Sequence, residues 1–345
     1  MANFVVNMGG RATGLFNEYV KSFYSTETSV LDGPVASIGQ GRDGLAAAAC
    51  GNYFLAMGGK TENSTPVSAI NVYEFNRRDD GSYGIREIQD PDLALSEPRY
   101  NLAAGTLGNY ILALGGMESH GLPLATVDIF QVTADGVEPA PLESSLSIGR
   151  SSLAAASSGD YLLAMGGLEQ VSSVPQVNGP SDAIDVFRLT GSEIQRVETH
   201  SLRLSEARYN LAATTCGEYI FAMGGYNSPG IYSDAVDVFR VTSNGVVGIQ
   251  TDLRLSVPRD GLAAAACGDY VFAMGGYAGG MYSNVVDVFK VTANGMEKVN
   301  IPLVLKEPRD SLTAGSCGNF VLAMGGRGRE DRISSAIDVF EVKQN

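Results

Sequence analysis

Residue types on which many catalytic and metal sites depend are scarce in this chain. Its 345 residues include no tryptophan and two histidines, His120 and His200. A Ser-His-Asp triad or a histidine-based metal site needs histidine close to its partners, and these two lie in non-equivalent segments. We interpret both as solvated loop residues, and we expect no catalytic residue, no metal and no cofactor.

Positive charge and long apolar runs are also in short supply. Lys and Arg number 24 against 38 Asp and Glu, a net charge of −14, whereas a nucleic-acid binder needs concentrated positive charge to neutralise phosphates. No apolar run reaches the length of a membrane span, and the N-terminus has no basic segment followed by an apolar stretch and a cleavage site. We therefore expect a soluble, cytoplasmic protein whose partners include neither nucleic acid nor membrane.

The four cysteines stand at one position of a repeated pattern, directly before a glycine. They are Cys50, Cys216, Cys267 and Cys317. Equivalent residues of different repeats are normally held far apart, so neither a disulfide framework nor a metal cluster is expected. Reduced, partly buried thiols fit a cytosolic protein.

The repeat itself is marked by paired glycines. Seven doublets lie in register about fifty residues apart, at Gly9–Gly10, Gly58–Gly59, Gly115–Gly116, Gly166–Gly167, Gly224–Gly225, Gly275–Gly276 and Gly325–Gly326. This period is too long for most helical repeats and is typical of a propeller blade. The expected blade segments are 1–40, 41–97, 98–148, 149–206, 207–257, 258–307 and 308–345.

Each complete repeat contains four short apolar runs, named a to d. Run a follows an arginine and is rich in small residues, as in RDGLAAAACG (42–51); it is too short for an independent helix, and a strand crowded against a central axis explains its alanines. Run b, as in YVFAMGG (270–276), is apolar throughout, which indicates a strand buried on both faces, and its glycines indicate a bulge or a close backbone approach. Run c alternates, as in AVDVFRV (235–241), and run d is the most polar, as expected of an outer edge strand.

An aspartate recurs in run c. Two carboxylates close together can perform acid–base hydrolysis, but a residue that recurs from repeat to repeat favours a structural hydrogen bond. The five are Asp128, Asp185, Asp237, Asp287 and Asp338.

The order of arginine, small residues, four apolar residues, Gly-Gly and an aromatic strand resembles the kelch repeat. The resemblance covers nearly the whole chain and implies an all-β fold, a β-propeller of four-stranded blades. The chain departs from the kelch pattern in having no tryptophan in the fourth strand. Galactose oxidase shares this architecture, but its copper site needs several His and Tyr ligands that this sequence does not supply.

The runs at the two ends of the chain leave the number of blades open. The N-terminal segment has runs b (FVVNM, 4–8), c (19–24) and d (around 29–38), and the C-terminal segment has runs a, b and c. Seven blades, two of them one strand short, are favoured over six blades with an added hairpin at 3–24. The seam between the first and last blades is therefore a candidate for strand addition by a partner or for self-association.

Antiparallel strands place the b–c and d–a loops on one face of the ring. The b–c loops vary in length and sequence, and variable loops on a rigid repeated scaffold usually carry binding. The arginines that begin run a are expected on this face, and they are Arg42, Arg99, Arg150, Arg208, Arg259 and Arg309. Guanidinium groups suit carboxylates, and the kelch resemblance implies recognition of acidic peptide segments. A repeated structural contact, for example with Asp43, Asp260 or Asp310, is the favoured alternative.

Tyrosines and further arginines lie in the same loops. Exposed aromatics on one face indicate contact with a protein or a sugar, and packing of the loops against one another is an equally supported interpretation. The candidates are Tyr100, Tyr209, Tyr226, Tyr232, Tyr277, Tyr282, Arg327 and Arg329.

These patterns together predict a non-enzymatic module for protein–protein interaction, or a scaffold. It would present its variable b–c loops to a protein partner, with an acidic segment as one option. The alternative, from a different class, is a propeller that binds or modifies carbohydrate.

Overall fold

The structure is a computed structural model. It describes residues 4–12, 15–25, 30–77, 83–90, 92–173, 176–199 and 201–343, and the environment of side chains from residue 36 onward except 77 and 83. Apart from one 3-10 turn, η1 (Arg329–Asp331), the described elements are strands. The all-β prediction is confirmed.

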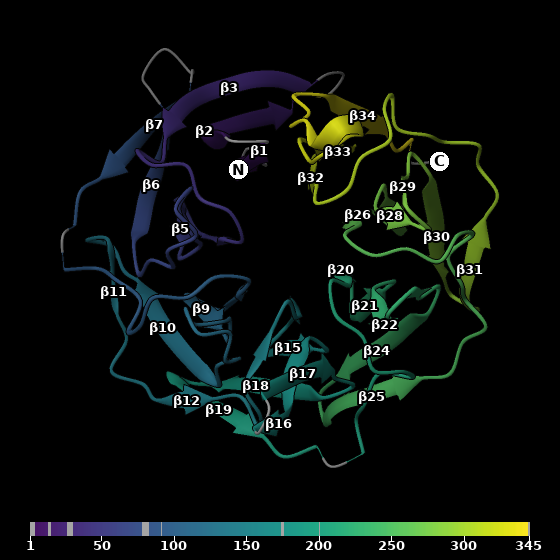
Figure 1. The fold of residues 1–345 in the computed structure, drawn as a ribbon, viewed down its shortest axis with the longest axis horizontal. Coiled ribbons are helices and arrows are strands. Elements are labelled where there is room, and N and C mark those ends of the chain that lie inside the picture. Colours follow the sequence, from purple (N-terminus) through teal and green to yellow (C-terminus); the bar gives the residue numbers. More distant parts are fainter. Residues whose placement is uncertain are drawn as a thin grey trace.

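Antiparallel sheets follow one another around a central axis, as Figure 1 shows. The innermost strands are β4 (Ala46–Cys50), β8 (Ala103–Leu107), β14 (Ala154–Ser158), β20 (Ala212–Cys216), β26 (Ala263–Cys267) and β32 (Thr313–Cys317). Each contacts the next around the axis, so run a is innermost as predicted. Small side chains are needed there because radial sheets converge at the axis.

Runs b, c and d form the successive outer strands of each sheet. Run b gives β5 (Tyr53–Met57), β9 (Tyr110–Leu114), β15 (Tyr161–Met165), β21 (Tyr219–Met223), β27 (Tyr270–Met274) and β33 (Phe320–Met324). Run c gives β6 (Ile70–Arg77), β10 (Thr126–Val132), β18 (Ile184–Thr190), β24 (Val236–Thr242), β30 (Val286–Thr292) and β34 (Ile337–Glu341). Run d gives β7 (Tyr83–Ile88), β11 (Val137–Pro139), β19 (Glu193–Val197), β25 (Gly245–Ile249) and β31 (Gly295–Val299), while β12 (Ser144–Ser145) also pairs with β10.

The N-terminal segment forms a three-stranded sheet of β1 (Phe4–Ala12), β2 (Leu15–Ser25) and β3 (Val30–Ser37). β1 contacts β32 and β3 contacts β7, so this sheet lies between the first and last sheets of the remaining chain (Figure 1). The sheet β32-β33-β34 also has three strands in the described residues. Seven blades, with the two at the seam one strand short, stay a prediction.

Apolar clusters fill the space between adjacent sheets. Run b is the most buried element, and β9, β15 and β33 are buried at every position. One such cluster joins Leu107 of β8 to Phe187 of β18 in the next blade. The blades are therefore held together by side chains from both faces of run b.

The glycine doublets lie where consecutive blades approach most closely. The amide of Gly225 donates to the carbonyl oxygen of Arg259, the first residue of the next blade, at 2.9 Å. A Cβ on Gly224, whose φ is +63°, would lie 2.6 Å from that same oxygen. Glycine is required here by both backbone conformation and space, which confirms the predicted close approach.

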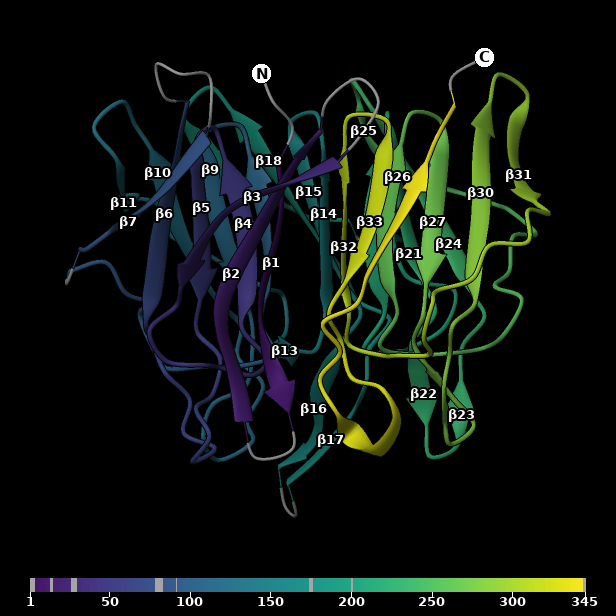
Figure 2. The same cartoon turned by 90° about the horizontal axis from the view of Figure 1, so that it is seen from above.

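The loop face carries small extra hairpins, which project from one side of the ring in Figure 2. They are β16 (Leu168–Ser173) with β17 (Gln176–Pro180), β22 (Tyr226–Ser228) with β23 (Ile231–Tyr232), and β28 (Tyr277–Ala278) with β29 (Met281–Tyr282). β13 (Arg150–Ser151) pairs with β16. These hairpins are three of the b–c loops that the sequence marked as variable.

Candidate functional site

The six arginines that begin the innermost strands are buried, not exposed around the mouth. Five of them have no exposed surface, and Arg42 has 2%. A buried guanidinium group cannot meet a partner in solution, so the expectation of an arginine ring as a receptor for acidic segments is wrong for Arg42, Arg99, Arg150, Arg208, Arg259 and Arg309. The expectation of an acidic partner loses its main basis with them.

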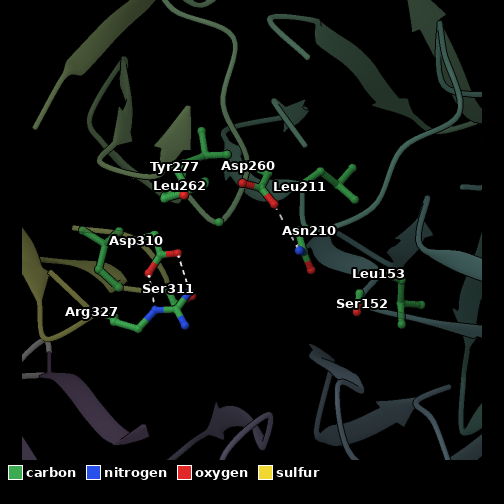
Figure 3. Close-up of a pocket in the computed structure, with 12 residues that line it drawn as sticks. Ser152, Leu153, Asn210, Leu211, Asp260, Leu262, Tyr277, Asp310, Ser311 and Arg327 are labelled. Carbon is green, nitrogen blue, oxygen red and sulfur yellow. Dashed lines mark hydrogen bonds and ion pairs between the residues drawn. The ribbon is translucent and has the colours of Figure 1, made fainter. Parts of the chain in front are cut away.

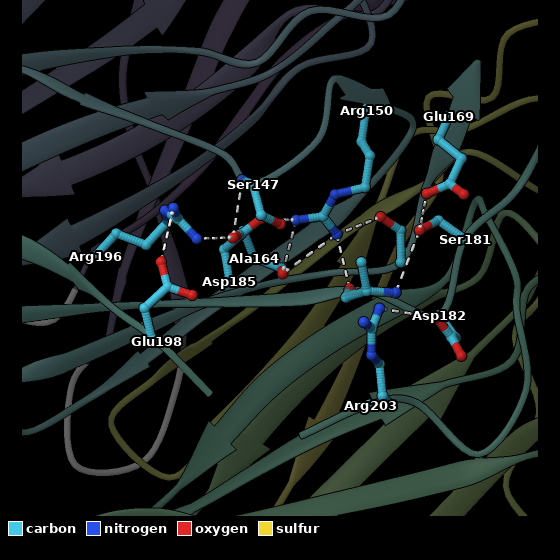
Figure 4. A network of polar contacts seen from close by, with 12 residues as sticks. Ser147, Arg150, Ala164, Glu169, Ser181, Asp182, Asp185, Arg196, Glu198 and Arg203 are labelled. Carbon is cyan, nitrogen blue, oxygen red and sulfur yellow. Dashed lines mark hydrogen bonds and ion pairs between the residues drawn. The ribbon is translucent and has the colours of Figure 1, made fainter. Parts of the chain in front are cut away.

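Each of these arginines instead reaches the run-c position of its own blade. Figure 4 shows Arg150 bonded to the carboxylate of Asp185, and it also donates to the carbonyl oxygens of Ala164 and Ala183. The other oxygen of Asp185 accepts from the backbone amide of Ser147, in the loop that enters the blade, at 2.9 Å. The network fixes strands a, b and c and the entering loop to one another.

The same arrangement recurs around the ring, which confirms a structural role for the run-c aspartates. The pairs are Arg99–Asp128 (2.7 Å), Arg150–Asp185, Arg208–Asp237 (2.6 Å), Arg259–Asp287 (2.9 Å) and Arg309–Asp338 (2.6 Å). In the first complete blade Arg42 bonds to Asn71. The alternative partners Asp43, Asp260 and Asp310 are not used by these arginines in the described residues.

A chain of backbone hydrogen bonds runs from blade to blade around the opening of the central channel on the b–c loop side, here called the mouth. The residue two places after each arginine has a positive φ, and from Asn101 onward its amide donates to the equivalent carbonyl of the preceding blade at 2.7 to 3.0 Å. These residues are Gly44, Asn101, Ser152, Asn210, Gly261 and Ser311. The mouth is therefore a rigid rim, on which side chains are held in fixed positions.

A pocket of about 410 Å³ opens inside this rim, and the rim residues Ser152, Asn210, Gly261 and Ser311 of four consecutive blades line it. Figure 3 shows its polar side chains converging from separate blades. Asp310 makes a two-oxygen contact with Arg327 at 3.0 and 3.2 Å. Asp260 accepts a hydrogen bond from the side-chain amide of Asn210 at 3.2 Å, and Tyr277 lies on the same wall.

Five of the candidate tyrosines form one continuous row across two blades and end at an arginine of a third. Ring centroids along the row are 5.0 to 6.2 Å apart, in edge-to-face or tilted geometry. The order is Tyr209, Tyr226, Tyr232, Tyr277, Tyr282 and then Arg327, whose guanidinium carbon lies 5.9 Å from the last centroid. All five rings are half-buried, so they pack against one another and still present an edge to solvent.

Two candidates lie apart from the row. Tyr100 is in the 98–148 blade, where the ammonium group of Lys60 lies 4.6 Å above its ring and its hydroxyl contacts Met117. Arg329 is exposed in η1. Of the fourteen sequence candidates, the structure therefore brings six together in this row, buries the six arginines that begin run a and places these two elsewhere.

Exposed apolar side chains at the loop tips are the feature that sequence reasoning missed. Met281 is 71% exposed, Val171 59% and Ile231 54%. Five of the exposed large hydrophobic residues belong to four consecutive b–c loops, and they are Leu122, Val171, Val177, Ile231 and Met281. The signal was present, because Ile231 and Met281 each precede a tyrosine of the row in matching loops.

The other sequence candidates for chemistry lie outside this site. His120 is exposed and contacts Glu118, and His200 falls outside the described residues. All four cysteines are buried thiols, and none of them forms a disulfide. Within the described ranges no group of His, Cys, Asp and Glu is arranged to hold a metal, and no helix there is long and apolar enough to cross a membrane.

Comparison with known proteins decides the kind of propeller. The kelch motif matches residues 207–244 and 258–294, which include the row of tyrosines. The chain carries two kelch motifs and has the fold of a kelch-type β-propeller. Among the 597 matching chains of solved structures, one titled "Structure of YjhT" has a TM-score of 0.61 at 13% identity, over 88% of this chain and 96% of that chain.

These comparisons identify the fold of the kelch propeller and no activity. A comparison with curated protein sequences found no match. Because one fold hosts unrelated functions, a likeness to many solved chains carries no function by itself. Function is therefore inferred from the residues of the loop face.

Proposed function

We propose that this kelch propeller is a non-enzymatic interaction module that binds a protein partner on its b–c loop face. The observation that carries the proposal is the set of exposed apolar tips on four consecutive loops, beside the half-buried row of tyrosines. Interfaces are enriched in aromatic residues and Met, and apolar patches with polar rims mark contact sites on soluble proteins. Kelch propellers include binding modules, which agrees with this proposal.

The blade scaffold suits such a role because the loops are held without needing a ligand. The hydroxyl of Tyr226 accepts the amide of Gly230 at 2.7 Å, which closes the β22–β23 hairpin. The hydroxyl of Tyr282 bonds to Asp331 in the next blade, and burial together with this bond raises the pKa of Tyr282 to about 12. A preformed surface loses little entropy when a partner binds.

Affinity capture with quantitative mass spectrometry tests the proposal. The bait variant is Ile231→Asp with Met281→Asp, and the matched control is Val247→Asp, because Val247 is 48% exposed on the outer strand β25. We expect a set of proteins that wild type and the control capture equally and the double variant does not. Equal capture by all three baits would contradict the assignment to this face.

Carbohydrate is the second candidate ligand, and the pocket at the mouth favours it. Asn210, Asp260 and Tyr277 combine hydrogen-bonding groups with an aromatic ring. Sugars are commonly bound by side chains of these two kinds. A glycan array run beside the capture experiment separates the two candidates. Clean glycan binding with no protein partner would replace the first proposal by the second.

The seam of the ring is a second proposed contact surface. In the described residues β34 pairs with β33 alone, whereas β24 lies between β21 and β25. An open edge can accept a strand from another chain. We expect a concentration-dependent dimer in sedimentation velocity that Val339→Lys abolishes, because lysine protects edge strands; a monomer at every concentration would contradict self-association here.

A further inference from the structure

Aspartates occupy equivalent places at the mouth in three blades, and two of them face a basic residue across the blade. Asp43 bridges to Lys60, whose ammonium nitrogen lies 4.0 Å from its carboxylate. Asp310 bridges to Arg327, which makes the two-oxygen contact described above. In both blades the negative charge at the rim is compensated within the blade.

The third aspartate, Asp260, faces Tyr277 instead of a basic residue. Among the described side chains, its hydrogen bond from another residue comes from the neutral amide of Asn210. Burial raises the pKa of Asp260, with the charge of Asp310 acting in the same direction, while the hydrogen bond from Asn210 and the charge of Arg327 oppose the rise. This carboxylate therefore lines the pocket without an ion-pair partner among the described side chains.

An internal repeat of the sequence isolates the cause of this difference. The ten residues RDGLAAAACG occur identically at 42–51 and 259–268. Asp43 and Asp260 thus share their local sequence, their place just before the innermost strand and their place at the mouth. What differs is the residue after the glycine doublet, Lys60 in one blade and Tyr277 in the other.

We infer that Asp260 binds the ammonium or guanidinium group of a ligand, in the place that a lysine or arginine of the chain fills in the other two blades. The ring of Tyr277 lies beside this place, and aromatic faces attract cations. The pocket volume of about 410 Å³ has room for the end of a basic side chain. The inference rests on the proposed function, and the cation belongs to a lysine or arginine of the protein partner.

The charges beneath and around the pocket do not oppose a bound cation. The buried arginines are neutralised by the run-c aspartates, so they do not repel a cation at the rim. Arg327 is paired with Asp310, and in Figure 3 the carboxylate of Asp310 lies between Arg327 and Asp260. Asp260, Asp310 and Arg327 leave the pocket with one negative charge, which a monovalent cation matches.

Titration by NMR spectroscopy tests the inference with defined probes. The probes are the N-acetyl methylamides of lysine, arginine and citrulline, with n-butylamine as a free amine. We expect saturable shifts of the Gly261 amide and the Asn210 side-chain amide with the lysine and arginine probes, and none with citrulline, which is neutral and nearly isosteric with arginine. Tighter binding of the lysine probe than of butylamine supports a peptide side chain, and the reverse order overturns it.

Two isosteric variants provide the matched comparison. Asp260→Asn should weaken binding of the basic probes by at least about tenfold, because it removes a charge-assisted hydrogen bond, whereas Asp43→Asn should leave it unchanged. Equal binding by wild type and Asp260→Asn, or an equal loss in both variants, would overturn the inference. If probe binding fails while capture of partners still depends on Ile231 and Met281, the inference is wrong and the proposed function stands. If the basic probes bind through Asp260 while capture does not depend on Ile231 and Met281, the cation site stands and the proposed function is wrong.

Discussion

Arg259 and Asp260 are neighbours in the sequence, yet their charges have different surroundings. The guanidinium group of Arg259 is buried and lies 2.9 Å from Asp287, whereas the carboxylate of Asp260 faces the mouth pocket. Burial is tolerated for an ion only when the fold supplies a partner. Asp260 has no ion-pair partner among the described side chains, and it is the residue to which we assign a ligand.

Asp260→Asn should stabilise the folded protein at neutral pH. A carboxyl group whose pKa is raised on folding binds its proton more tightly in the folded state, so stability falls as pH rises between its unfolded and folded pKa values and stays lower above them. The midpoint of urea unfolding of the variant should exceed that of wild type at pH 7, and the gap should narrow as pH falls towards 4. A difference in midpoint that grows as the pH falls would contradict a raised pKa of Asp260.

Removing one partner of a buried ion pair should lower the free energy of unfolding far more than replacing both partners with apolar residues. Arg309→Met leaves the nearly buried carboxylate of Asp338 without its guanidinium group and should lower the free energy of unfolding by about 3 to 5 kcal/mol. The double variant Arg309→Met with Asp338→Leu should lose clearly less. Arg329→Ala, at an exposed position, should stay within about 0.5 kcal/mol in the same denaturant series; similar losses in both single variants would refute the structural role.

At the scale of elements, the blades meet through backbone as much as through side chains. The first glycine of five doublets lies against the arginine carbonyl of the next blade, as at Gly224 and Arg259. Side chains at the end of the innermost strands add further links, since Cys216 donates to the carbonyl oxygen of Gly268 at 3.3 Å. Ser158 does the same to Gly217 at 2.9 Å, so cysteine and serine serve equally at this position.

Gly224→Ala should destabilise the protein more than Gly217→Ala. Both glycines have a positive φ near 60°, which costs an alanine about 1 to 2 kcal/mol, but only at Gly224 would the new Cβ meet the carbonyl of Arg259 at 2.6 Å, since Gly217 has no atom within 4 Å. The difference in unfolding free energy therefore measures the blade contact. Equal losses in the two variants would show that the contact contributes nothing.

The strands were predictable because their signals are local, and the role of the arginines was not. Small residues at run a and apolar residues at run b give the strand order directly. Arg150 begins a strand beside a loop, which suggests exposure, but its long side chain reaches Asp185 inside the blade. The pairing signal was the recurrence of both residues in the same blades, together with Asn71 opposite Arg42. The tyrosine row followed from two matching loops, while the loop-tip exposure depends on hairpin geometry.

At the scale of the whole molecule, the two faces of the ring are built for different purposes. The a–b turns are short and nearly uniform in sequence, whereas the b–c side carries the hairpins that project in Figure 2. The tyrosine row and the mouth pocket belong to the b–c side as well. The asymmetry also runs around the ring, because the rings from Tyr209 to Tyr282 gather on two neighbouring blades. A partner is therefore expected to sit off the axis, over these blades and the one that follows.

Site-specific photo-crosslinking tests this account most directly. A benzoylphenylalanine in place of Met281 lies at the tip of β28–β29, and one in place of Val247, which is also exposed, lies on the outer strand β25 as a control. We predict a discrete crosslinked partner from position 281, reduced by Ile231→Asp, and none from position 247. A partner that crosslinks from position 247 and not from 281 would contradict the proposal that the b–c loop face is the binding surface.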